Sequence, residues 1–177
     1  MEALLAIRRF MIRPAMSDDR AKLMLLIDAI GLFPPDELKE VESLLADYFA
    51  GNTGSDHFWI TDDDGGHLVG VAYYAPERMT NGTWNLYLIG VHPSYRGQGR
   101  GAALLRLIEQ ILAERGGRLL LVETSGLPEF ERTRTFYRKC GFEEEACIRE
   151  FYKAGDDKII FRKALTKQGV KAFANVS

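Results

Sequence analysis

The sequence predicts a single α/β domain with helices packed on a mixed β-sheet, and two observations lead to this prediction. Three strand-like runs follow one another in the middle of the chain, separated by the turn sequences DDDGG and TNG, which favours an antiparallel meander. The later run RLLLVETS (118–125) is continuously apolar, as is typical of a strand that is buried on both faces and parallel to a neighbour. Segments with helical periodicity precede and follow both kinds of strand.

At the start of the chain we expect one short strand and two helices. Residues 9–15 form the strand, which ends at Pro14, and Ser17 is a candidate N-cap for the helix that follows. Gly31 interrupts this helix, and acidic residues in the first turn favour a second helix over 36–50. The three strands of the meander are expected at 57–61, 67–75 and 83–91.

The second half of the chain is expected to alternate between helices and strands. Leucine and isoleucine recur at helical spacing from Leu104 on, and the pair Gly116 and Gly117 ends that helix. After the strand at 118–125, Pro128 opens a helix that ends before the sequence CGF. Two final strands are joined by the turn KAGDD, so the predicted order is β-α-α-β-β-β-α-β-α-β-β.

Composition limits the classes of protein to which the chain can belong. Its 177 residues are expected to form one domain (1–177), with a core at about 9–165 and a polar tail at 166–177. The formal net charge is −2, so we expect neither a nucleic-acid partner nor a membrane surface. The two cysteines fit neither a disulfide framework nor a zinc site, and no metal is expected. We expect a cytoplasmic protein, and the oligomeric state is open, a homodimer included.

The segment VHPSYRGQGRGAALL (91–105) brings three glycines to the start of a predicted helix. A glycine-rich turn that enters a helix leaves several N–H groups unpaired at the positive end of the helix dipole, and such a site binds phosphate. Arg96 and Arg100 add positive charge. A flexible connection without a ligand is the alternative, but it does not account for the helix that follows directly.

A dinucleotide fold is a second interpretation of the same glycines. Gly97, Gly99 and Ala102 satisfy the pattern G-x-G-x-x-A, and Glu123 lies about twenty residues further on, where that motif has its ribose-binding acid. However, the sequence HPSYR separates Val91 from Gly97, and the strands before it are expected to form hairpins rather than a parallel βαβ unit. A Rossmann-type NAD-binding protein is therefore a minor alternative. A Walker loop is excluded because no Gly-Lys-Ser/Thr sequence follows.

The whole segment IGVHPSYRGQGRGAALL resembles the acetyl-CoA signature of the GCN5-related N-acetyltransferases (GNAT). The core of that signature is Arg/Gln-x-x-Gly-x-Gly/Ala after a strand ending in Val-x-Pro, and Arg96, Gly99 and Gly101 occupy those positions. The sequence FYRKCGF (136–142) resembles the second signature of the family, and the predicted order of elements matches its fold. The resemblance covers about residues 9–165 and implies direct transfer of an acetyl group from acetyl-CoA to an amine.

By this resemblance, backbone amides of the glycine segment hold the pyrophosphate of acetyl-CoA. The implied cofactor-binding residues are Arg96, Gly97, Gln98, Gly99, Arg100, Gly101 and Ala102. Glycine suits this place because a Cβ atom would keep the phosphate oxygens away from the N–H groups.

Gly90 interrupts an otherwise good strand, which indicates either a bulge or close packing. A bulge would free backbone groups of Ile89 and Val91. Members of the family pair the pantetheine arm of CoA with such groups, and the resemblance also implies that the Ile89 amide stabilises the oxyanion.

The resemblance implies a catalytic acid, and the strand pattern suggests a base. Tyr137 lies at the position of the general acid that protonates the departing thiolate, and the adjacent Phe136 is the better candidate for the core. Glu123 is the only acid on the apolar strand 118–125, where burial would raise its pKa toward the range of a general base. A structural ion pair between Glu123 and an arginine such as Arg134 is an equal alternative.

One position departs from the family pattern. Many members have an asparagine seven residues before the tyrosine, where it steadies the cofactor, and here that position is Phe130. Arg134 is therefore a candidate for holding the middle section of the cofactor.

The acceptor amine is specified less well. In the family it binds between the first two helices (GLFPPDE here) and the last hairpin (IREFYKAGDDK here). Glu150, Asp156 and Asp157 would suit a cationic amine, although a solvated acidic hairpin explains them equally well. The sequence IREFY resembles the tyrosine-bearing strand of the ribosomal-protein N-terminal acetyltransferases, so a peptide α-amine is one alternative for the acceptor, and a polyamine, an amino acid or an aminoglycoside is another. A non-catalytic acyl-CoA sensor is an alternative of a different class.

Overall fold

The structure is a computed structural model that describes residues 10–165, and its elements follow the predicted order. The strands are β1 (Met11–Pro14), β2 (Phe58–Asp64), β3 (His67–Pro76), β4 (Thr83–Val91), β5 (Leu119–Ser125), β6 (Glu143–Lys153) and β7 (Asp156–Ala164). The helices are α2 (Arg20–Ile30), α3 (Leu38–Phe49), α4 (Arg100–Glu114) and α5 (Glu131–Lys139). The predicted tail at 166–177 lies outside the described residues.

The strands form one sheet in the order β1-β2-β3-β4-β5-β7-β6. The β2-β3-β4 meander is antiparallel, as predicted. β5 runs parallel to β4, which confirms the prediction for 118–125, and antiparallel to β7 on its other side. The Rossmann alternative is wrong, because that fold is built from successive parallel strands and this sheet contains one parallel pair among the described strands.

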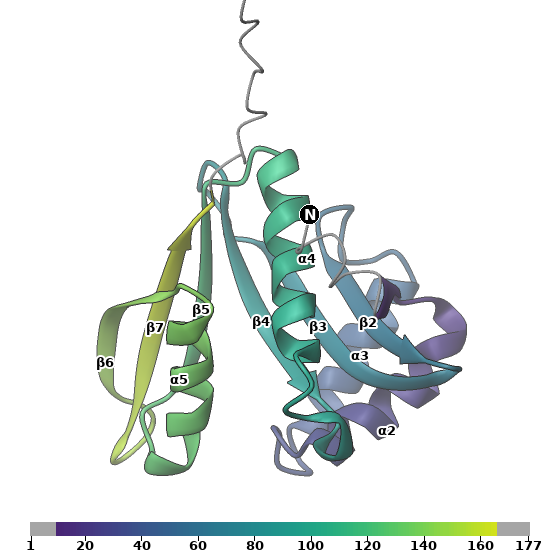
Figure 1. The fold of residues 1–177 in the computed structure, drawn as a ribbon, viewed down its shortest axis with the longest axis horizontal. Coiled ribbons are helices and arrows are strands. Elements are labelled where there is room, and N and C mark those ends of the chain that lie inside the picture. The colour runs from purple at the N-terminus through teal and green to yellow at the C-terminus, as the bar shows by residue number, and fades with distance from the viewer. Residues whose placement is uncertain (1–9, 166–177) are drawn as a thin grey trace, which may run out of the picture.

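Helices cover both faces of the sheet and bury two separate groups of apolar side chains. α2 and α3 pack on one face of β2, β3 and β4, around Leu23, Ile27 and Leu45. α4 and α5 pack on the opposite face, around Leu104 and Ile108. Figure 1 shows α4 and α5 in front of the sheet and α2 and α3 behind it.

Within residues 10–165, no helix is long and apolar enough to cross a membrane.

The start of the first helix differs from the prediction. Ser17 is not its N-cap: it opens a short 3-10 turn, and α2 begins at Arg20. The carboxylate of Asp19 accepts a hydrogen bond from the Met16 backbone at 2.8 Å and pairs with Arg13 at 2.6 Å. These contacts hold the pKa of Asp19 below its usual range, and the hydrogen bond from Arg13 has the largest effect.

Gly90 marks close packing rather than the bulge that would free its neighbours. It pairs in regular register with Val71 on β3. A Cβ atom at Gly90 would lie 2.8 Å from the side chain of Ile30 at the end of α2. The bulge in β4 lies three residues earlier, because Tyr73 is opposite Leu88 whereas the next residue of β3 is opposite Leu86. Glycine at position 90 therefore lets α2 approach β4.

Gly90→Ala is expected to destabilise the protein by about 1–3 kcal/mol, because the added methyl group would overlap Ile30 in a packed core. Urea denaturation should show a lower midpoint at an unchanged m-value. In an Ile30→Ala background, which removes the overlapping atoms, most of the added cost should disappear. An equal cost in both backgrounds would contradict close packing as the reason for this glycine.

Candidate active site

β4 and β5 pair over only part of their lengths. The parallel ladder joins Thr83–Leu86 to Leu119–Val122. Beyond it β4 continues to Val91 and β5 to Ser125, and the two strands diverge toward the end where β4 leads to α4 (Figure 1). Within the described chain, the backbone groups of 87–91 that point away from β3 have no neighbouring strand. An extended ligand can pair with such an edge as an added strand would.

The glycine segment follows directly on this open edge. Gly97 and Gly99 have φ values of 75° and 84°, in the left-handed region that glycine adopts readily. Both residues are exposed, and Gly99 is the N-cap of α4. The amides of the first turn of α4 have no intrahelical partners and lie at the positive end of its dipole. The loop therefore has the geometry of an anion-binding site.

The two arginines of the loop, Arg96 and Arg100, donate hydrogen bonds to other parts of the protein. Arg96 donates to the carbonyl of Val91 and to the carbonyl of Ile30 at the C-terminus of α2, both at 3.1 Å. Arg100 is buried, and its guanidinium pairs with Asp62 at 2.8 Å. Because Arg100 is buried and paired, its side chain does not add the expected free charge for a phosphate. Arg96 is exposed, so its contribution of charge stays a prediction. The backbone amides of the loop carry the anion-binding geometry.

Tyr137 lies on α5 and points into the core between α4, α5 and the sheet. It is 4% exposed and packs with Val122 and Phe161. Burial raises the pKa of Tyr137 well above its ordinary value. Phe136 is only partly buried and packs near Gly101, so the expectation that Phe136 rather than Tyr137 is the core residue is wrong.

Glu123 lies on the opposite face of β5 from Tyr137. Side chains alternate along a strand, and its neighbour Val122 packs with Tyr137. The carboxylate of Glu123 pairs with Lys158 at 2.6 Å, not with Arg134, and its side chain is 32% exposed. The burial expected for Glu123 is therefore only partial, and the alternative pairing with Arg134 is wrong.

Arg134 fastens the end of β5 to α5. Its guanidinium donates to the carbonyls of Ser125 and Leu127 at 2.6 and 3.0 Å, and it pairs with Glu131 at 2.8 Å. Because Arg134 is 7% exposed and its guanidinium groups are used in these contacts, the structure gives this side chain a structural position rather than a cofactor contact.

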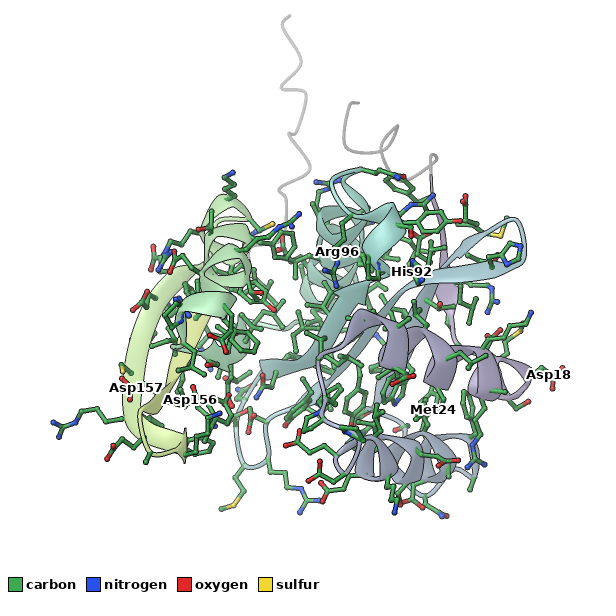
Figure 2. All side chains as sticks on the ribbon, turned by 90° about the horizontal axis from the view of Figure 1, so that it is seen from below. Asp18, Met24, His92, Arg96, Asp156 and Asp157 are labelled. Carbon is green, nitrogen blue, oxygen red and sulfur yellow. The ribbon has the colours of Figure 1, made fainter. Side chains whose placement is uncertain are left out.

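The acidic residues of the last hairpin accept hydrogen bonds from groups in and beside the hairpin. Asp156 is buried and accepts a hydrogen bond from the hydroxyl of Ser125. Asp157 accepts from the backbone amide of Glu150, and the Glu150 carboxylate accepts from the amide of Gly155. Figure 2 shows Asp156 and Asp157 on this hairpin, away from Arg96 and His92 of the glycine loop. The structure thus gives these acids internal partners in place of the expected role in attracting a cationic amine.

The face of the sheet that carries Glu123 also carries half-exposed tyrosines. Partial burial and the carboxylate of Glu77 raise the pKa of Tyr87 to about 12, and Glu123 contributes to this shift. The pKa of Tyr152 is also raised, mainly by partial burial and to a smaller extent by the negative charge of Glu123. Both tyrosines therefore lie within electrostatic range of Glu123.

Sequence reasoning missed three residues of this region. Tyr87 is the extra residue of the β4 bulge, and Lys158 reaches Glu123 from the neighbouring strand, a register that sequence does not reveal. Asp62 belongs to the predicted turn DDDGG, but in the structure it lies two residues after the buried Ile60, on the same face of β2, and a carboxylate on an inward face needs a buried partner. No group of three or more potential metal ligands occurs among residues 10–165.

The fold agrees with a comparison to known proteins. A family model for the acetyltransferase (GNAT) domain matches residues 54–144. A solved structure of a GNAT-family protein from Desulfovibrio desulfuricans is 32% identical, with a TM-score of 0.84, and the match covers 89% of this chain and 99% of that one. The chain belongs to the GNAT acetyltransferase family.

More distant solved structures share the fold. The ribosomal-protein-S18-alanine N-acetyltransferase from Escherichia coli is 22% identical, with a TM-score of 0.71 over 93% of this chain and 99% of that one. An aminoglycoside 6′-N-acetyltransferase in complex with coenzyme A is 17% identical, with a TM-score of 0.68 over 90% and 99%. No curated protein matches the chain significantly.

Gly99→Ala is expected to weaken CoA binding by about 10-fold, because alanine resists the left-handed conformation that turns the loop amides outward. Gly116→Ala is the matched control: Gly116 has a φ of 82°, ends the same helix and also has open space around it. Both variants should lose similar stability in thermal unfolding, and titration calorimetry should show weaker binding only for Gly99→Ala. Equal affinities for CoA would contradict the anion-binding geometry of the loop.

Proposed function

We propose that this protein transfers the acetyl group of acetyl-CoA to a primary amine by direct attack in a ternary complex. The observation that carries the proposal is the early end of the β4–β5 ladder after Leu86, which leaves an unpaired strand edge between Tyr137 on one face and Glu123 on the other. Membership of the GNAT family supports the reaction class.

The donor binds along the open edge and the glycine loop. The pantetheine arm pairs with the backbone of Ile89, Gly90 and Val91, and the pyrophosphate accepts hydrogen bonds from the amides between Gly97 and Ala102. The exposure of this loop and its position directly after β4 support this course. The acetyl group then lies beside the part of β4 that has left β5.

Acetyl transfer requires a proton to reach the leaving sulfur. The amine nitrogen attacks the carbonyl carbon, the backbone amide of Ile89 on β4 donates a hydrogen bond to the oxyanion, and the C–S bond breaks as CoA leaves. Tyr137 donates its proton to the thiolate, and its raised pKa keeps the hydroxyl protonated throughout the neutral and mildly alkaline range. The amine loses a proton to Glu123, directly or through water.

The acceptor approaches from the Glu123 face, which α4 and α5 leave open. The half-exposed Tyr87 and Tyr152 flank this approach. The two named neighbours act on an alanine of ribosomal protein S18 and on an aminoglycoside, and at 22% and 17% identity they share only the fold with this chain. The proposal therefore covers primary amines of peptides and of small molecules alike.

Tyr137→Phe is expected to lower kcat by about 100-fold or more while the Kd for CoA stays within about twofold, because the ring still fills the core and only the acid is lost. Turnover can be followed by CoA thiol release with any amine that the wild type acetylates.

The wild-type rate should rise with pH as the amine deprotonates, without a descending limb below about pH 10, because burial raises the pKa of Tyr137 above the ordinary value of about 10.

Tyr74→Phe is the matched control, since Tyr74 is also buried in the same core and burial raises its pKa to about 12. Its kcat should equal that of the wild type. Unchanged turnover in Tyr137→Phe would contradict the acid role. A wild-type protein that binds CoA but releases no thiol with any amine would instead favour the non-catalytic acyl-CoA sensor.

Glu123→Gln is expected to lower kcat about 10- to 100-fold at neutral pH, and the loss should shrink as the pH rises and amines deprotonate without help. Lys158→Met breaks the same ion pair but keeps the carboxylate, so it should retain most of the activity. Full pH–rate profiles of both variants separate the two roles. Equal losses in both variants, or a loss that is independent of pH, would show that Glu123 acts only through its ion pair.

A further inference from the structure

The buried pair of Asp62 and Arg100 joins β2 to the first turn of α4. Arg100 is 7% exposed and Asp62 is fully buried, and their side chains meet at 2.8 Å. A second contact joins Arg100 to Asp64 at 3.1 Å, and the guanidinium lies 5.2 Å from the ring centre of Tyr95. Arg100 is thus held on several sides at the residue where the glycine loop becomes a helix.

Stability alone does not account for this pair. Moving two charges out of water costs about as much as their attraction returns, and a cation at a helix N-terminus also opposes the dipole. Apolar residues would anchor the helix without either cost. A buried ion pair does, however, specify one position of the helix against the strand, because a displaced guanidinium would leave the Asp62 carboxylate buried without a partner.

The β2-β3 hairpin holds the glycine loop at both of its ends. The register of β2 and β3 shifts between Asp62 and its successor, and the carbonyl of Val69 accepts a hydrogen bond from the His92 amide at 2.8 Å, where the loop begins. The Asp62–Arg100 pair holds the end of the loop. Gly70 allows this close approach, since a Cβ atom there would lie 3.1 Å from both Asp62 and Leu104.

We propose that Asp62 and Arg100 are positioning residues that hold the glycine loop in the conformation that binds the pyrophosphate of acetyl-CoA. Neither side chain touches the donor in this proposal. Asp62 neutralises Arg100, so the positive end of α4 faces the phosphates through its backbone amides alone. The inference rests on the proposed function, because it concerns the same donor site.

The test compares two ligands that differ in the pyrophosphate. CoA contains it, whereas pantetheine carries the same thiol arm without the pyrophosphate and the nucleotide. The double variant Asp62→Asn/Arg100→Met removes both charges, so it avoids the lone buried carboxylate that Arg100→Met alone would leave. Titrations followed by NMR give the Kd of both ligands. The double variant should bind CoA about 10-fold more weakly and pantetheine within about twofold of the wild type.

A matched control comes from the same helix. Glu109 on α4 pairs with Lys163 on β7 at 2.8 Å, so Glu109→Gln/Lys163→Met removes an ion pair that ties α4 to the sheet away from the loop. This control should leave the Kd for both ligands unchanged. Arg100→Lys retains the charge without the planar guanidinium and should recover part of the CoA affinity.

Three results would overturn the inference: an unchanged Kd for CoA in the double variant, equal weakening of CoA and pantetheine, or an equal effect of the control pair. The wild-type titration tests the proposed function separately, because a protein that binds neither ligand would refute the donor site itself. Thermal unfolding of each variant identifies any loss of affinity that comes from unfolding.

Discussion

β4 and β5 stop pairing after Leu86 and Val122, and a sheet that opens in its interior leaves backbone N–H and C=O groups without strand partners. At an outer edge such groups face solvent, but here the packed α4–α5 core covers one side of them. The α4–α5 core lies on one side of the opening and the face of Glu123 on the other. The donor site, the acid and the approach of the amine all depend on this divergence, because each uses a surface that a continuous sheet would cover.

The charges around the opening are arranged mainly by pairing within the protein. Arg96 reaches the end of α2, Arg100 reaches Asp62, and Arg134 fastens β5 to α5, so each of these guanidiniums already donates to groups of the protein in this conformation. The anion-binding capacity therefore comes from backbone amides fixed in direction by two left-handed glycines. Fixed dipoles require little reorganisation when the ligand binds, whereas long flexible side chains must lose rotamer freedom.

The sequence predicted the order of elements, the meander, the parallel strand and the position of the glycine loop, because hydrophobic period and turn chemistry are local signals. It did not predict what arginines and acids contact across the fold. Arg100 and Asp62 are 38 residues apart, and the partner of Glu123 depends on the β5–β7 register. Gly90 illustrates the same limit: a glycine in a strand indicates a bulge or close packing, and only the position of Ile30 decides between them.

Amide hydrogen exchange with and without CoA tests most directly whether the opening between β4 and β5 is the donor site. Binding should slow exchange at those amides of 87–91 that point away from β3, and at the amides of the glycine loop, while the β2–β3 ladder changes little. Protection confined to the loop, or located elsewhere in the fold, would contradict the account, since the exposed edge of β4 would then remain unpaired in the complex.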